Sequence, residues 1–219
     1  MKTERNAGDW KETSIVNILI VFYSRYGNTE QMALAVAEGA REIPGAQIKL
    51  AFTGDDMTPA PVLDRDPRWQ KSRERLLREY PLAEMGDLTW ADAVIFGSPT
   101  RYGNMAAQLK LYFDKMSDVW LAGGLVDKIG GAFCCSGTMH GGQETTLLTM
   151  YVPMIHQGML IAGVPYTEPL ISTTDRGGSP YGPGAVVGAA ADHPPNETEL
   201  AIARTLGRRV ARLTAQLRG

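Results

Sequence analysis

The chain has 219 residues, of which 21% are charged, and its formal net charge is −2. This length suits a single α/β domain with a sizeable core. The balanced charge argues against nucleic acid or an anionic membrane as a partner, and no apolar run reaches the roughly 20 residues of a membrane span. The two cysteines, Cys134 and Cys135, are adjacent. This favours free thiols in a reducing cytoplasm.

Residues 1–14 are polar and lack the apolar core of a secretory signal, so we interpret them as a loose N-terminal extension. The next stretch, VNILIVFYSRYGNTE over 16–30, organises the chain. Its apolar run 18–22 predicts a strand buried on both faces. A small polar turn, Ser24–Thr29, follows, and the spacing of apolar residues then predicts a helix over 30–42.

A strand that ends in such a turn and opens into a helix is suited to bind an anion. The first-turn N–H groups have no partner, and the helix dipole adds positive potential there. The turn is neither GxxxxGK[ST] nor GxGxxG, which excludes a P-loop and a dinucleotide fingerprint. A loop without lysine suits a phosphate monoester, and SRYGNTE resembles the FMN phosphate loop of flavodoxin-like proteins. The alternative is a plain turn whose hydroxyl residues serve only as helix caps.

The rest of the chain alternates strands and helices. Apolar runs predict strands over 47–52, 93–96, 129–134 and 159–163, and helical spacing predicts helices over 105–116, over 143–157 and from Asn196 onward. Glu199 is placed to complete a capping box with Asn196. This alternation predicts an α/β fold: a flavodoxin-like, doubly wound, five-stranded parallel sheet of order 2-1-3-4-5 in three layers.

Two segments interrupt the alternation within the single domain expected over 15–219. An insertion at about 55–86 carries a charged stretch, DPRWQKSRERLLREY, which fits either a short surface helix that packs over a neighbouring subunit or a solvated loop. A loop over 164–195 is rich in Gly and Pro and has no periodicity. Loops of that length are unusual unless they have a function.

Three polar turns follow predicted strands, at Ser24, Thr100 and Ser136. Ligands of such sheets bind at the carboxyl ends of the strands, near the switch between strands one and three. We therefore expect the three turns to converge on one site.

With these turns, the chain resembles the WrbA family, whose members are tetrameric FMN-containing NAD(P)H:quinone oxidoreductases. The matching strings are SRYGNTE, GSPTRYGNMAAQLK, DVWLAGGLVDK, SGTMHGGQE, HQGM and RGGSPYG. The resemblance implies bound FMN, NADH or NADPH as co-substrate, a quinone as acceptor, and a homotetramer built as a dimer of dimers. It implies no metal.

The resemblance also implies roles for single residues. The turn 24–29 holds the FMN phosphate, backbone N–H groups of 100–102 face the pyrimidine edge of the flavin, and 136–141 cover its other side. Tyr26 contacts the nucleotide, Trp120 shapes the substrate slot, and His156 reaches the flavin of its own or of a neighbouring subunit. The expected cofactor-binding residues are Ser24, Arg25, Tyr26, Gly27, Asn28, Thr29, Thr100, Arg101, Tyr102, Ser136, Gly137, Thr138, Met139, His140, Gly141 and His156.

Several of these residues have a plainer alternative. Arg101 also fits a surface arginine, His156 a hydrogen-bonded core histidine, and Trp120 ordinary interface packing. Cys134 and Cys135 lack the CxxC spacing of a redox dithiol, so we interpret them as packing residues.

The third turn departs from the family pattern. Met139 and His140 stand where family members commonly carry Thr and Gly. The detailed flavin contacts of this loop are therefore not carried over.

The resulting hypothesis is a two-electron reduction of quinones by NADH or NADPH, with both substrates using one slot over the flavin in a ping-pong cycle. His156 is the possible supporting group. Alternatives are a flavodoxin-type carrier of single electrons, which the weak net charge argues against, and a regulatory binding protein.

Overall fold

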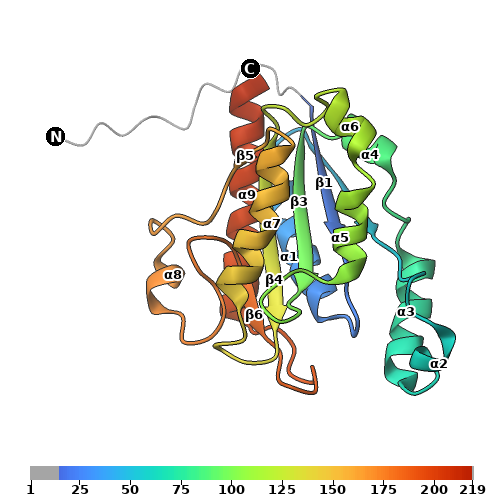
Figure 1. Cartoon of the computed structure of the whole chain (residues 1–219). Coiled ribbons are helices and arrows are strands. Elements are labelled where there is room, and N and C mark those ends of the chain that lie inside the picture. The colour runs from blue at the N-terminus through green and yellow to red at the C-terminus, as the bar shows by residue number, and fades with distance from the viewer. Residues whose placement is uncertain (1–14, 219) are drawn as a thin grey trace.

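The computed structural model describes residues 15–218 (Figure 1). Within this range a parallel sheet has the order β2-β1-β3-β4-β5, which confirms the predicted order. The strands on this path are β1 (Val16–Phe22), β2 (Ala46–Phe52), β3 (Ala93–Pro99), β4 (Ile129–Ser136) and β5 (Leu160–Ile161). The proposed extension 1–14 lies outside the described residues.

The apolar run of β1 explains its central place, because side chains alternate between two buried faces. Ile18, Ile20 and Phe22 enter one core, whereas Leu19 and Val21 enter the other. Helices α1 (Asn28–Arg41) and α9 (Glu197–Arg218) cover the first face, and α5 (Ala107–Asp114) and α7 (Gln143–His156) cover the second. The three layers follow directly from this two-sided burial.

Helices α1 and α9 approach each other closely because glycine lies at their contact. A Cβ atom on Gly39 would lie 1.9 Å from the carbonyl oxygen of Arg204, and one on Gly207 would lie 1.9 Å from that of Val36. Any side chain at either position would push the helices apart. The predicted capping box at the start of α9 is confirmed: Asn196 Oδ1 accepts from the Glu199 N–H at 2.9 Å, and Glu199 accepts from the Asn196 N–H at 2.8 Å.

The insertion forms helices rather than the solvated loop that was one of the two alternatives. It contains α2 (Ala60–Leu63), α3 (Pro67–Glu79) and α4 (Met85–Trp90). The charged stretch is α3, whose Trp69 and Leu76 are buried. Arg75 on α3 forms an ion pair with the buried Glu30 on α1. These contacts fix α3 beside the turn that follows β1.

The loop expected over 164–195, here called the late loop, contains a helix and a strand that the sequence did not predict. It holds α8 (Pro169–Thr173) and β6 (Gly184–Val186), and β6 pairs in parallel with the carboxyl end of β4. Glu199 is fully buried and accepts hydrogen bonds from the N–H groups of Gly177 and Val186. A buried carboxylate therefore ties the late loop to the start of α9. The predicted fifth strand, in contrast, is shortened to two residues.

The carboxyl ends of the parallel strands meet at one end of the molecule (the lower end in Figure 1). The short α6 (Ser117–Leu121) and the last turn of α7 lie at the opposite end. Among residues 15–218, none of the helices is long and apolar enough to cross a membrane.

Candidate functional site

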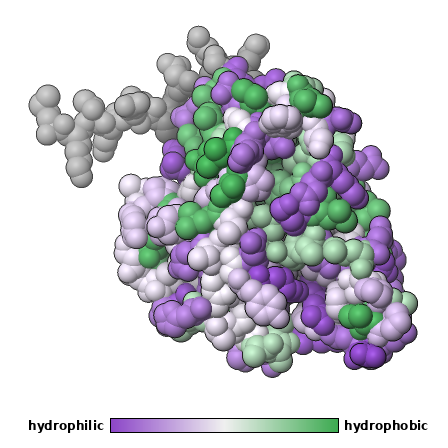
Figure 2. Space-filling model, in the orientation of Figure 1, coloured by the Kyte–Doolittle hydropathy of each residue, from purple (hydrophilic) through white to green (hydrophobic). Residues whose placement is uncertain are grey.

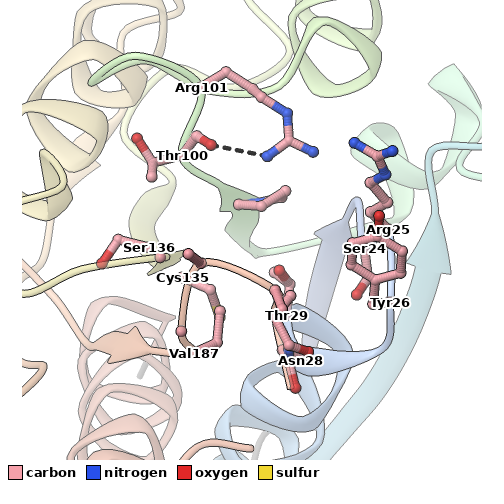
Figure 3. Close-up of a pocket in the computed structure, with 16 residues that line it drawn as sticks. Ser24, Arg25, Tyr26, Asn28, Thr29, Thr100, Arg101, Cys135, Ser136 and Val187 are labelled. Carbon is pink, nitrogen blue, oxygen red and sulfur yellow. Dashed lines mark hydrogen bonds between the residues drawn. The ribbon is translucent and has the colours of Figure 1, made fainter. Parts of the chain in front are cut away.

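A cavity of about 230 Å³ lies at the carboxyl ends of β1, β3 and β4 (Figure 3). Residues from all three predicted turns line it, together with a segment of the late loop. The lining residues are Ser24, Arg25, Tyr26, Asn28, Thr29, Pro99, Thr100, Arg101, Cys135, Ser136, Gly137, Val187, Gly188, Ala189, Ala190 and Ala191. The volume is somewhat below the roughly 300–1,000 Å³ typical of small-molecule sites.

The turn after β1 forms a cradle for an anion. Gly27, at φ +98°, is the N-cap of α1, and no side chain caps this helix. Among the described residues the N–H groups of Asn28 and Thr29 have no acceptor, since the Gln31 N–H is the first to bond back, to Gly27. The Ser24 Oγ accepts from the Gly27 N–H at 3.0 Å, which shapes the turn and leaves the hydroxyl proton free to donate. The cap-only alternative is therefore wrong.

The insertion supports this turn through Asp66. Its carboxylate accepts from the hydroxyl of Tyr26 at 2.5 Å and from the guanidinium of Arg25 at 2.9 Å. The hydrogen bond from Tyr26 is the main reason why the pKa of Asp66 lies below its ordinary value. The pKa of Tyr26 is raised, first by burial and then by the same bond.

Two side chains connect the turn and the insertion to the late loop. The side-chain amide of Asn28 donates to the carbonyl of Ala191 at 3.0 Å. Arg68 on α3 donates to the carbonyl of Ala190 at 2.7 Å and also to that of Ala191. The Asn28 side chain is thus used to hold a wall of the cavity, and only its backbone N–H faces an anion in the cradle.

The turn after β3 is a tight loop that is held from within. The Thr100 hydroxyl accepts from Thr146 at 2.7 Å, and the N–H groups of Thr100 and Arg101 donate to the carbonyls of Cys135 and Asn104. These two N–H groups are therefore not free to face a flavin, contrary to expectation. Tyr102, at φ 53°, is fully exposed, and its N–H has no acceptor among the described residues. The Arg101 side chain lines the cavity, and burial is the main cause that lowers its pKa.

The turn after β4 reaches the cavity only at its first residues. Ser136 is buried and its hydroxyl donates to the carbonyl of Thr138 at 2.7 Å. Gly137 lines the cavity beside Gly188 of the late loop. The rest of the expected set in this turn, Thr138, Met139, His140 and Gly141, does not line the cavity, and Thr138 to His140 are exposed.

Two expected residues lie away from the cavity within one chain. Trp120 is on α6 and His156 ends α7, at the end of the molecule opposite the carboxyl ends of the strands (Figure 1). Both side chains are exposed. Their expected contacts with the substrate and the flavin therefore require a second copy of the chain.

Sequence reasoning missed the wall 187–191. These residues are apolar or glycine and carry no chemical signal, so only the length of their loop pointed to a function. Cys135 also lines the cavity, although packing was the expected role. Burial raises the pKa of its thiol to about 12, which makes it a poor nucleophile.

The residues present fit FMN. Backbone N–H groups and hydroxyls at the N-terminus of α1 suit a phosphate dianion, because the helix dipole favours negative charge there. From this cradle the cavity leads past Ser136 to the turn 99–101. A flavin ring beyond the phosphate would lie between the turns after β3 and β4.

Comparison with known proteins agrees with this geometry. Residues 17–167 match the family model described as NADPH-dependent FMN reductase. A Geobacter sulfurreducens protein named NAD(P)H dehydrogenase (quinone) is 42% identical over 206 residues, covering 93% of this chain and all of that protein. A Trichlorobacter lovleyi protein of the same name is 44% identical, covering 91% of this chain and 98% of that protein.

A solved structure supports the same assignment. The WrbA-like flavodoxin of Agrobacterium tumefaciens superposes with a TM-score of 0.61 at 27% identity, covering 92% of this chain and 98% of that one. The sheet order, the uncapped cradle and these matches lead to one conclusion: the chain belongs to the NADPH-dependent FMN reductase family and is a WrbA-like, flavodoxin-fold member of it.

Proposed function

We propose that the protein uses bound FMN to transfer two electrons from NADH or NADPH to a quinone. The observation that carries this proposal is the cavity, which joins a phosphate cradle of backbone N–H groups and hydroxyls at α1 to the turns after β3 and β4. The relatives named NAD(P)H dehydrogenase (quinone) support the reaction. FMN, when bound, supplies the chemistry by taking up and giving off a hydride equivalent.

The protein's own residues bind and orient the reactants. The backbone N–H groups and hydroxyls of the cradle hold the phosphate, the segment 187–191 closes one side of the cavity, and the turn 100–102 borders the flavin. The exposed ring of Tyr102 and the half-buried ring of Tyr26 provide surfaces against which a flat ring can stack. The nucleotide and the quinone use the same slot in turn, in a ping-pong cycle, and no protein nucleophile takes part.

The active protein is a homotetramer, a dimer of dimers, in this proposal. Helix α7 exposes Leu148, Val152 and Ile155 at a spacing that places them on one face. The exposed Trp120 and Leu121 extend the apolar surface onto α6, and Figure 2 shows apolar residues gathered over this region. A second copy on this face would bury it and bring Trp120 and His156 towards a neighbouring cavity.

The two buried, free cysteines favour a reducing compartment, so we place the protein in the cytoplasm.

The test begins with the purified protein. We expect a flavin spectrum, FMN identified by mass spectrometry, and reduction of benzoquinone that depends on NADH or NADPH. If FMN-loaded protein fails to reduce benzoquinone with either nucleotide, the proposal is wrong. Stable accumulation of a semiquinone during reductive titration would instead indicate a single-electron carrier.

A further inference from the structure

Two guanidinium groups lie near each other on one side of the cavity (Figure 3), and they share no hydrogen-bond acceptor among the described residues. Figure 3 shows Arg25, from the turn after β1, and Arg101, from the turn after β3, on the side of the cavity away from Asn28 and Thr29. Both line the cavity. The positive charge of Arg25 adds to burial in lowering the pKa of Arg101, so the two groups are close enough to repel.

Both arginines keep unused donors. One terminal N–H group of Arg25 donates to the carboxylate of Asp66 at 2.9 Å, while the buried Nε of Arg25 has no hydrogen-bond partner. One terminal N–H group of Arg101 donates to the Thr100 carbonyl at 2.8 Å, and the other side-chain nitrogens of Arg101 have no acceptor among residues 15–218. A buried unpaired donor is costly in free energy, so these N–H groups suit an anionic ligand.

Stacking holds Arg25 in place. Its guanidinium lies 3.9 Å from the ring centroid of Trp69, which is buried, and 5.0 Å from that of Tyr26. A planar group fixed between rings loses little freedom when it binds a ligand. Trp69 belongs to α3 of the insertion, so this helix holds the Arg25 guanidinium at the edge of the cavity.

The charges around the pair leave an excess of positive charge. The Asp66 carboxylate also binds Tyr26, and Asp55, whose charge acts on Arg101, has its two oxygens engaged by Tyr23 and Gln108. Arg68 adds a third guanidinium, 4.4 Å from the Tyr26 ring. These three guanidinium groups outnumber the two carboxylates, whose oxygens are already hydrogen-bonded.

We propose that Arg25 and Arg101 form a second anion subsite, which binds a phosphate group of the nicotinamide nucleotide. This inference rests on the proposed function. The FMN phosphate already has the backbone N–H groups and hydroxyls at the start of α1, and a quinone carries no phosphate, so the nucleotide is the reactant left to supply the anion. Its diphosphate and the 2′-phosphate of NADPH have the same chemistry, and the experiment must separate them.

The experiment measures the binding of redox-inert fragments to the FMN-loaded protein, from the change in flavin absorbance. ADP represents the diphosphate, and 2′-AMP represents the 2′-phosphate. The variants are Arg25→Gln, Arg101→Gln and the charge-retaining Arg101→Lys. The matched control is Arg78→Gln, which removes a charge from the exposed side of α3.

Loss of one charge-assisted contact should weaken binding by about 10- to 100-fold. We expect this loss for both glutamine variants, a smaller loss for Arg101→Lys, and none for the control. If only ADP is affected, the subsite binds the diphosphate; if only 2′-AMP is affected, it binds the 2′-phosphate and selects NADPH.

The subsite is refuted if both fragments bind the glutamine variants within twofold of the unmodified protein. It is also refuted if fragment binding is unchanged while the affinity for FMN, or for sulfite at the flavin, falls, because the pair would then serve the flavin. These readings require no turnover. Absence of quinone reduction would overturn the proposed function, whereas fragment binding tests the subsite separately because it needs no quinone.

Discussion

Gly27 determines how the cradle is presented. Its left-handed backbone, φ +98°, turns the chain so that the first N–H groups of α1 face the cavity, with no side chain capping them. A Cβ at this position would meet its nearest atoms only at 3.4 Å, so the cost of a substitution is backbone strain rather than collision.

We therefore expect Gly27→Ala to lower the free energy of unfolding by about 1 kcal/mol and to weaken FMN binding, because the turn must relax. Urea unfolding and FMN titration measure the two effects. Gly86→Ala is the matched control, since Gly86 lies in helix α4 with nothing within 4 Å of its Cβ position and should be neutral or slightly stabilising. Equal behaviour of the two variants would contradict the prediction.

Burial lowers the reactivity of the Cys135 thiol, although this residue lies beside the cavity. Its pKa of about 12 results first from burial, and only the Thr29 hydroxyl opposes that effect. Burial also raises the pKa of Cys134 well above its ordinary value. Because both raised values favour the neutral thiol, the thiolate is scarce until the pH approaches the pKa in the folded protein.

The folded protein should accordingly resist alkylation by iodoacetamide at about pH 8, and both cysteines should be labelled once urea unfolds the chain. Mass spectrometry of the intact protein counts the labels. Rapid labelling of the folded protein would show that the strand end opens readily.

At the scale of elements, α3 connects the turn after β1 to the wall 187–191. Arg68 bonds to the carbonyls of Ala190 and Ala191 and lies over the ring of Tyr26. One arginine thus joins the turn after β1 to the wall 187–191. The insertion is therefore part of the site, although its residues do not line the cavity.

We expect Arg68→Gln to raise the FMN dissociation constant by about tenfold through loss of this connection. Fluorescence titration of the apoprotein with FMN measures the change. Arg65→Gln, which removes the same charge from an exposed insertion residue, should leave the constant unchanged. An unaltered constant in Arg68→Gln would show that Asn28 alone suffices to hold the wall.

The sequence predicted elements where one physical signal dominates. β1 contains an unbroken apolar run, and Asn196 with Glu199 gives a local capping signal, so both elements were predicted correctly. β6 was missed because it has three small residues among glycines, and its pairing depends on distant contacts with β4 and Glu199. The carboxyl ends of the strands located the cavity, but residues that act through their backbone, such as 187–191, carry no pattern to read.

At the scale of the molecule, the remaining question is how Trp120 and His156 relate to the cavity. Within one subunit they lie at the end of the molecule away from the cavity, beside the apolar face of α7. Assembly would explain both the exposed apolar side chains and the position of these two residues.

The double variant Val152→Asp, Ile155→Asp should dissociate the assembly, because it places two charges in an apolar contact. Size-exclusion chromatography with light scattering reports the mass, and Val62→Asp on the distant α2 is the control. Quinone reduction per FMN should fall together with the mass. A monomeric unmodified protein, or a double variant of unchanged mass, would exclude this face as the contact.

The late position of β6 also orders events during synthesis. The cavity joins the turn after β1 to Ala191, and β6 with its buried Glu199 anchor comes near the end of the chain. A nascent chain on the ribosome would carry the phosphate cradle long before it carries the opposite wall. FMN therefore has a complete cavity to enter only after β6 and Glu199 have been made and packed together, so loading follows the formation of the cradle rather than accompanying it.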